Sequence, residues 1–172
     1  MHMLLASKLG ALGVLLSDIG ERATEELSIS AAALLLTLSY HAGATATELA
    51  QIAGIAQPTA VRVLDGLIRR GLVVRRKRAG RSAPLDLTVA GKKRAERLLS
   101  VRRRDIGGLL TAFSAKERAS LERLLDRLLA SATTSRAFAR TTCRLCDHGA
   151  CCGSRCPVGT RATELELRGG EA

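Results

Sequence analysis

The stretch from Thr45 to Leu87 constrains the fold most, because it predicts two short helices, a tight turn and a hairpin in close succession. Thr45 and Glu48 have the spacing of a capping box, in which a hydroxyl and a carboxylate satisfy free amides at a helix start. Gly54 then falls where a turn between two helices needs a residue that tolerates positive φ. Pro58 fits only the first turn of a second helix, since proline has no N–H. The stretch predicts a helix-turn-helix followed by a hairpin.

The second helix has an apolar stripe and an outward side of different chemistry. We expect the stripe to be buried, and it consists of Val61, Leu64, Leu67 and Ile68. The start and outward side carry amide, hydroxyl, guanidinium and small apolar groups, which suit base edges in the major groove of DNA. The predicted DNA contacts here are Gln57, Pro58, Thr59, Arg62 and Val63, with Ala60 expected on the same side.

A basic hairpin follows this helix. Short β-branched or leucine-containing runs at residues 72–74 and 85–87 predict two strands. The segment from Arg69 to Arg81 contains seven Arg and Lys residues and no Asp or Glu, so a phosphate backbone is its expected partner. A solvated basic loop is the alternative. The predicted phosphate contacts are Arg75, Arg76, Lys77, Arg78 and Arg81.

The composition agrees with a basic helical protein. The chain has 27 Lys and Arg against 16 Asp and Glu, a formal net charge of +11, so nucleic acid or an anionic membrane surface is the expected neighbour. Hydrophobic residues make up 47 % but include no Trp and only three aromatic Tyr and Phe residues, which favours packed helices over the stacking of single-stranded bases. The predicted fold class is mainly α (α+β), with a two-stranded wing.

Two further segments resemble motifs of a known protein family. The hairpin begins GLVVRR at residues 71–76, and the next helix begins LTVAG at residues 87–91. Together with QPTAVRVLDGLIRR before them, they make residues 3–130 similar to the multiple antibiotic resistance regulator (MarR) family. The resemblance implies a homodimeric winged helix-turn-helix repressor that binds a pseudo-palindromic operator in double-stranded DNA. Arg81 matches the wing arginine that enters the minor groove in that family. The chain departs from the family at Ala56, where Ser or Asp usually caps the recognition helix, and at Ala79, where the wing usually has Asp.

The ends of the resembling region predict dimerisation helices. Apolar residues recur at helical spacing over residues 5–19, and Ser114 with Glu117 forms a second capping box before another stripe. In the resembled family the first helix interlocks with C-terminal helices of a second subunit; a helix packed within a monomer is the alternative. The second stripe is Leu121, Leu124, Leu125, Leu128 and Leu129. The predicted division is 1–27 N-terminal dimerisation helix, 28–90 DNA-binding domain, 91–130 C-terminal dimerisation helices and 131–172 linker, Cys-rich motif and tail.

Several other classes are disfavoured. Residues 9–16 are apolar, but a polar segment without a cleavage site follows them, so neither a signal peptide nor a membrane span is predicted and a cytoplasmic location is expected. The three histidines form no hydrolase motif and there is no Gly-rich phosphate loop, so an enzyme is not predicted. Gly107 and Gly108 are expected to weaken or kink a helix, and residues 131–142 to form a loosening helix end or linker.

All five cysteines lie within 14 residues, with His148 among them: Cys143, Cys146, Cys151, Cys152 and Cys156. The C-x2-C pair and a second pair beyond a short loop predict a zinc site of four thiolates, or of three thiolates and the His148 imidazole. An iron–sulfur cluster, a thiol/disulfide switch without a cofactor, and no role remain open. A static disulfide is disfavoured in a reducing cytoplasm.

These features lead to one functional hypothesis and one alternative from another class. The hypothesis is a sequence-specific, homodimeric transcription regulator, a repressor, whose Cys-rich tail responds to a metal or an oxidant through the adjoining dimerisation helix. The alternative is an architectural or non-specific basic DNA-binding protein whose Cys motif is purely structural. The sequence names neither the operator nor a small-molecule effector.

Overall fold

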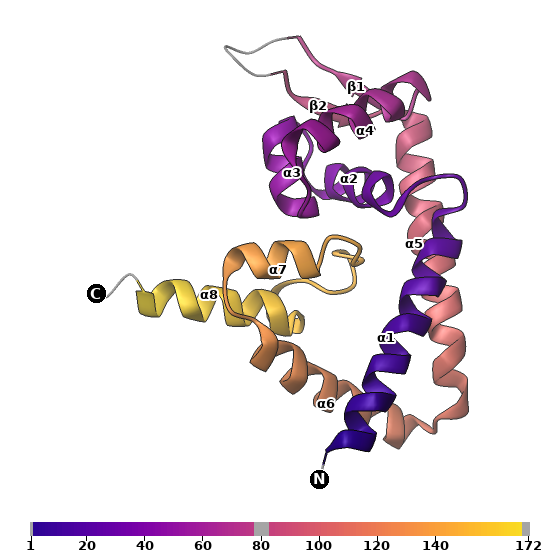
Figure 1. Cartoon of the computed structure of the whole chain (residues 1–172), viewed down its shortest axis with the longest axis vertical. Coiled ribbons are helices and arrows are strands. Elements are labelled where there is room, and N and C mark those ends of the chain that lie inside the picture. The colour runs from indigo at the N-terminus through magenta and orange to yellow at the C-terminus, as the bar shows by residue number, and fades with distance from the viewer. Residues whose placement is uncertain (1, 78–82, 170–172) are drawn as a thin grey trace.

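The computed structural model describes residues 2–77 and 83–169, which form a helical protein with one small antiparallel sheet (Figure 1). In chain order the elements are α1 (Met3–Thr24), α2 (Ile29–Tyr40), α3 (Ala46–Ala53), α4 (Gln57–Arg69), β1 (Val73–Arg75), β2 (Leu85–Leu87), α5 (Val89–Leu109), the 3-10 turn η1 (Leu110–Ala112), α6 (Ala115–Ala132), α7 (Arg136–Thr142), the 3-10 turn η2 (Gly153–Arg155) and α8 (Pro157–Gly169). The predicted mainly helical fold with a two-stranded wing is confirmed.

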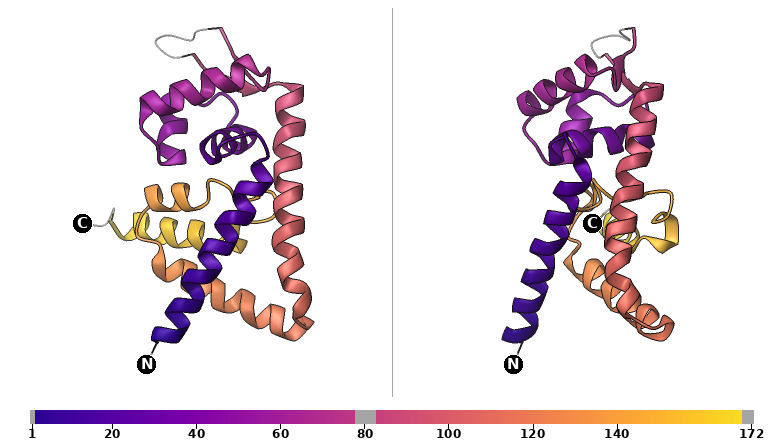
Figure 2. Two further views of the ribbon diagram at one scale, coloured as in Figure 1. Left: turned by 45° about the vertical axis from the view of Figure 1, so that its right-hand side comes forward. Right: turned by 90° about the vertical axis from the view of Figure 1, so that its right-hand side faces the viewer.

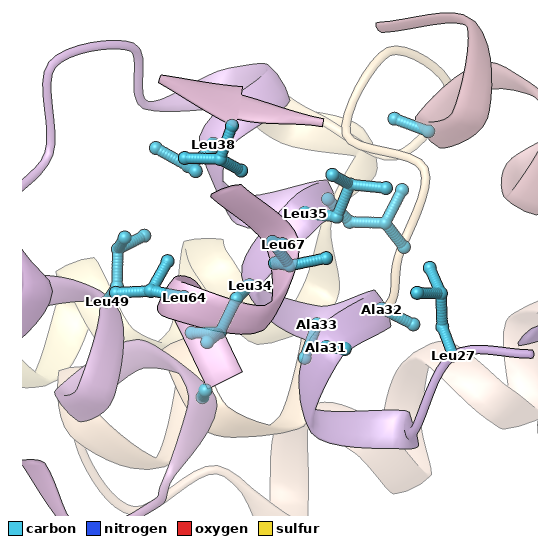
Figure 3. Close-up of a cluster of buried hydrophobic side chains, with 14 of the residues drawn as sticks. Leu27, Ala31, Ala32, Ala33, Leu34, Leu35, Leu38, Leu49, Leu64 and Leu67 are labelled. Atoms are coloured by element: carbon cyan, nitrogen blue, oxygen red, sulfur yellow. The ribbon is translucent and has the colours of Figure 1, made fainter. Parts of the chain in front are cut away.

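Helices α2, α3 and α4 and the hairpin form one unit around α2. Leu34, Leu35 and Leu36 are at most 1 % exposed, because α2 is apolar on nearly all sides and is covered by α3, α4, β2 and α5. Figure 3 shows Leu64 and Leu67 of α4 next to these α2 side chains, with Leu49 of α3 nearby. Burial of this kind contributes about 1.5–3 kcal/mol per large apolar side chain. The core therefore fixes how α3 and α4 lie relative to each other.

The local signals that predicted this unit are present. Thr45 and Glu48 form the capping box at the start of α3, and Gly54 ends that helix at φ +67°. Strand β1 pairs antiparallel with β2, with Val73 opposite Leu87. Because both of these side chains are buried, the hairpin packs against the core on one face.

The start of α5 packs tightly on the end of α4. Thr88 caps α5 by accepting the Gly91 amide at 3.0 Å, while its hydroxyl donates to the Gly71 carbonyl at 2.6 Å. A Cβ on Gly91 would stand 1.9 Å from the carbonyl oxygen of Leu72, so only glycine fits. This contact gives a physical reason for the Thr and Gly of the LTVAG segment.

The long helices α1 and α5 lie side by side and extend away from this unit (Figures 1 and 2). The loop after α1 is held by Glu25, whose carboxylate forms ion pairs with Arg94 and Arg97 of α5. These hydrogen bonds, with Arg94 as the largest cause, lower the pKa of the Glu25 carboxyl below its usual 4.5. Helix α1 is also long and apolar enough to span a membrane, with a mean hydropathy of 1.5 over a window that is only 11 % buried.

The C-terminal third folds back toward the middle of the molecule. Helix α6 runs across the end of the molecule that is opposite the wing, and α7 and α8 lie between α6 and the α2–α3 region (Figures 1 and 2). Helix α5 continues through Gly107 and Gly108 and ends at Leu109, so the predicted weak point lies at the end of the helix and there is no kink within it. The predicted linker at residues 131–142 contains α7, which Ser135 caps, and α8 was not predicted. Both helices are short and depend on packing: α7 packs against α3 and α8, and α8 also packs against α6.

Candidate nucleic-acid interface and cysteine cluster

The first two turns of α4 present an exposed polar surface. The exposed residues here are Gln57, Pro58, Thr59 and Arg62. The N-cap residue Ala56 makes no side-chain hydrogen bond to the start of the helix. The Gln57 amide donates to the Thr47 hydroxyl at 3.1 Å, which ties the start of α4 to α3. Thr59 and Arg62 are three residues apart and thus lie on the same side of the helix.

Two neighbouring residues of α4 face the core fully or in part. Ala60 is fully buried, so its expected outward position is wrong; it shares the core-facing side with Leu64 and Leu67 at helical spacing. Val63 is half-buried and packs against the core, which leaves only part of it at the surface. The side of α4 that can meet a ligand is therefore polar and narrower than predicted.

One ion pair joins the wing to α4, and a second links the two sides of the wing. Arg75 of β1 contacts Asp65 of α4 at 2.5 Å, and Arg76 forms an ion pair with Asp86 of β2. Asp86 also accepts the Gly43 amide at 3.0 Å. The segment 69–81 lacks acids of its own, but folding brings carboxylates to two of its arginines, which sequence reasoning missed because no local pattern links them.

Three further predicted phosphate contacts belong to the wing: Lys77, Arg78 and Arg81. Lys77 is exposed at the end of the described strand segment. Arg78 and Arg81, two of the predicted phosphate contacts, lie outside the described residues. DNA contact by any of these residues remains a prediction.

The Cys-rich segment packs against the helix-turn-helix unit of the same chain. The ring of His148 stacks on Tyr40 at the end of α2, with ring centroids 4.6 Å apart. The Tyr40 hydroxyl donates to Asp147 Oδ1 at 3.2 Å, and Arg103 Nη1 contacts Asp147 Oδ2 at 3.0 Å. Leu145 packs against the main core. The segment therefore touches both α2 and α5.

A second contact joins α7 to the turn of the helix-turn-helix. The methyl carbon of Thr141 lies 2.8 Å from where a Cβ on Gly54 would stand, and α7 packs along α3. The predicted influence of the tail ran through the dimerisation helix α6. The structure adds a shorter connection, since the Cys-rich segment directly touches the elements that position α4.

The thiols line one cavity of about 570 Å³, together with His148. Cys143 ends α7, and its thiol lies within hydrogen-bonding reach of Cys146; Cys151 and Cys156 form a second such pair. The Gly159 amide in the first turn of α8 donates to Cys156 Sγ at 3.2 Å. Within residues 2–77 and 83–169, no group of three or more His, Cys, Asp or Glu side chains is already gathered as a metal-holding cluster.

The surroundings give the thiols different pKa values. The pKa of Cys146 falls to about 7, first because Cys143 donates a hydrogen bond to its sulfur and then because Arg102 is nearby. Cys143 consequently has its pKa raised. Burial, followed by the neighbouring Cys156, raises the pKa of Cys151 to about 11. Arg102 is half-buried between α1 and the Cys-rich segment, and its Nη1 lies 2.8 Å from where a Cβ on Gly20 would stand.

Cys152 and His148 differ from the other donors. Cys152 is exposed, and its sulfur accepts from Arg155 Nη2 at 3.4 Å. The His148 ring is held by its stack on Tyr40, and its Nε2 lies 3.1 Å from the Cys143 carbonyl oxygen. Arg102 and Asp147 had no sequence signal that linked them to the cysteines, apart from the adjacency of Asp147 to His148.

An exposed helix after a tight turn, followed by a two-stranded wing, defines the class of winged helix-turn-helix proteins. Residues 26–82 match the family model described as the MarR family, so this part of the chain is similar to that family's domain. Members of this family are transcription regulators rather than enzymes. No curated protein sequence matches the chain.

Several solved structures share this fold. A mutant of Staphylococcus aureus MepR is 21 % identical with a TM-score of 0.68, covering 73 % of this chain and 96 % of its own. A MepR mutant bound to an oligodeoxyribonucleotide is 21 % identical with a TM-score of 0.59, covering 74 % and 96 %. The Mycobacterium tuberculosis MarR-family protein Rv2887, in complex with salicylic acid, is 28 % identical with a TM-score of 0.57, covering 72 % and 95 %.

Proposed function

We propose that this protein is a homodimeric, sequence-specific DNA-binding repressor that acts in the cytoplasm. The observation that carries the proposal is the exposed polar side of α4, where Gln57, Thr59 and Arg62 stand beside a basic wing on a rigid core. Such a helix can enter the major groove of double-stranded DNA while the wing contacts phosphates. The similar MepR structure with an oligodeoxyribonucleotide supports the same use of this fold.

The DNA-binding part is tested by selecting sites from random duplex DNA with the full chain. We expect enrichment of a pseudo-palindrome whose half-sites are about one helical turn apart, as two recognition helices of a dimer require. Fluorescence anisotropy on the selected and on scrambled duplexes should then differ at least about 1000-fold at physiological salt. Equal affinity for both would favour the alternative of an architectural or non-specific DNA-binding protein.

Repression is tested separately by transcription in vitro. A template with the selected site placed over its promoter should yield less transcript as the protein is added. The same template with a scrambled site serves as the control. An increase in transcript from the selected template would indicate an activator.

The dimer is supported by apolar surface that the single chain leaves uncovered. On α1, Leu5 is 56 % exposed, Leu9 43 % and Leu12 40 %, all on one side of the helix, and on α6 Leu124 is 59 % exposed. Exposed apolar residues in such continuous stripes mark interaction surfaces. A second copy that covers both stripes would also explain why the apolar helix α1, long enough to span a membrane, is so little buried.

Sedimentation velocity tests the dimer. Leu5→Glu with Leu12→Glu in α1 should produce monomers, because each places a charge in the proposed interface. Ser7→Glu, exposed on the opposite side of the same helix, is the control for an added carboxylate and should remain dimeric. A Leu5→Glu/Leu12→Glu protein that stays dimeric would show that α1 does not form the interface.

We further propose that the Cys-rich tail makes DNA binding responsive to a metal or an oxidant. Its support is the contact of residues 141–148 with Gly54, Tyr40 and Arg103, which connects the thiols to the elements that hold α4. A zinc ion or an iron–sulfur cluster would order this segment. Peroxide would instead convert two thiols to a disulfide, with the peroxide reduced to two waters.

The test measures operator affinity after treatment with a chelator or with peroxide. We expect affinity to change in the full chain and to stay constant in Cys143→Ser, Cys146→Ser and a truncation after Thr142. An identical affinity before and after both treatments in the full chain contradicts a sensing tail, while leaving the DNA-binding proposal intact.

A further inference from the structure

We infer that Cys143, Cys146, Cys151 and Cys156 are the ligands of one zinc ion, and that Cys152 and His148 lie outside the ligand set. This inference rests on the proposed metal response of the tail and specifies its site. It decides between Cys151 and Cys152 and leaves out His148, three donors among which the sequence alone left the choice open.

The four thiols form two pairs that face the same cavity from different parts of the backbone. Cys143 stands at the end of α7 and Cys146 in the turn that follows, while Cys151 and Cys156 flank η2 before α8. Spacing of two residues between Cys143 and Cys146 allows both sulfurs to bind one tetrahedral ion. Zinc binding would draw the two pairs together across the cavity.

The surroundings of the cavity suit negatively charged sulfur. A zinc ion with four thiolates carries a net charge of −2, which is costly in a half-buried place unless it is compensated. The guanidinium of Arg102 is half-buried beside Cys146. The Gly159 amide already donates to Cys156 Sγ at 3.2 Å, and such N–H···S bonds orient and stabilise a ligating thiolate.

The two excluded donors are engaged elsewhere. Cys152 also lines the cavity, but it is the exposed one of the five thiols, and its sulfur accepts a hydrogen bond from Arg155 Nη2 at 3.4 Å. His148 stacks on Tyr40 and its Nε2 lies 3.1 Å from the backbone carbonyl of Cys143. In that position the imidazole fixes the backbone of a ligand residue and does not compete for the ion.

Apolar packing contributes little to the stability of the Cys-rich segment. The apolar cluster of α7 and α8 consists of Ala139, Val158 and Ala162, with Leu129 of α6 at its edge. Small side chains of this kind bury little area, so they stabilise weakly. Metal ligation can supply the missing folding free energy of such a segment.

The inference is tested on the full chain purified under reductant and argon. We expect about one zinc per chain by mass spectrometry of metals, and cobalt-substituted protein should show tetrahedral d–d bands with strong thiolate-to-cobalt charge transfer. Ser substitution of each proposed ligand should lower the charge-transfer intensity by about a quarter or abolish metal binding. Cys152→Ser and His148→Phe are the matched controls and should leave zinc content and spectrum unchanged.

A second measurement needs no variant. Brief alkylation of the zinc-loaded native chain should label Cys152 and leave the four ligands protected, and removal of the metal should expose all five thiols. Loss of zinc in Cys152→Ser, protection of Cys152, or iron with acid-labile sulfide in place of zinc would each overturn the inference.

The same samples separate this inference from the proposed function. Operator affinity is measured in parallel on the zinc-loaded chain. Absent zinc with intact operator binding refutes only the metal site. A correct cobalt spectrum without operator preference refutes the regulator and leaves the site established.

Discussion

The rings of Tyr40 and His148 lie nearly parallel, 16° from each other with centroids 4.6 Å apart, and so join the last turn of α2 to the Cys-rich segment. Asp147 extends this contact, since it binds both the Tyr40 hydroxyl and Arg103 of α5. Desolvation and the nearby Asp147 carboxylate raise the pKa of Tyr40, so the phenol remains a hydrogen-bond donor at neutral pH.

We predict that Tyr40→Ala separates metal binding from DNA binding. The substitution removes a stack of about 0.5–1.5 kcal/mol together with the Asp147 hydrogen bond, while no metal ligand is touched. Zinc content should persist, but operator affinity measured by anisotropy should no longer change on chelation. Tyr40→Phe keeps the stack and is the control; we expect it to retain most of the response. If Tyr40→Ala responds to chelation as fully as the native chain does, the connection through α6 is the effective one.

Arg62 is predicted to read a base edge. Arg62→Ala should weaken binding to the selected site by about 1–3 kcal/mol and relax the preference at one position in each half-site. Arg168→Ala, an exposed arginine near the end of α8, is the control for lost charge. Repeating the site selection with the variant provides the measurement. A uniform loss on all sequences would instead make Arg62 a phosphate contact.

Lys77 is predicted to contact phosphate. Each phosphate contact that is lost reduces the slope of log K against log salt by about one. Lys77→Ala should therefore weaken binding equally on selected and scrambled DNA and lower this slope by about one. Lys116→Ala on α6 lies far from the wing and should leave the slope as it is. The same comparison applies to Arg78→Ala and Arg81→Ala. A native slope in all three wing variants would show that the wing does not touch DNA.

Gly91 is predicted to be irreplaceable for packing. An added Cβ would stand 1.9 Å from the Leu72 carbonyl oxygen, so Gly91→Ala must displace the start of α5 from the end of α4. Overpacking of this kind costs about 1–3 kcal/mol or more, which should appear as a lower midpoint in urea. Gly107→Ala on the same helix has no atom within 4 Å of its new Cβ and should be neutral or slightly stabilising. Equal midpoints for the two variants would contradict this account.

Glu25 is predicted to make stability depend on pH. Its folded pKa is lowered by Arg94 and Arg97, so its stabilising effect is complete above the ordinary value of 4.5 and is lost as pH falls through the lower folded value. Glu25→Gln should therefore have a lower melting temperature than the native chain at pH 7, and the difference should shrink below pH 4.5. Glu96→Gln, an exposed carboxylate on α5, is the control. A difference that stays constant with pH would exclude the ion pairs as its cause.

The sequence by itself determined the DNA-binding unit, because its signals act over a few residues. Thr45 with Glu48, Gly54 and Thr88 specify helix ends through side-chain and backbone preferences that hold in any context. The period of Leu64 and Leu67 likewise fixed which side of α4 is buried. The same reasoning failed at Ala60, since a small side chain next to exposed polar residues carries little information about the side on which it lies.

Only the tertiary structure decided what surrounds the cysteines. Helix α7 and helix α8 are too short to be stable alone, and they form because they pack on each other, α7 also on α3 and α8 also on α6. Arg102 reaches Cys146, and Tyr40 reaches His148, from helices that are far away in the chain, so no local pattern could connect them. Asp65 and Asp86 meet the wing arginines for the same reason. Contacts of this kind depend on the three-dimensional path of the backbone, which the sequence encodes only through the packing of the whole core.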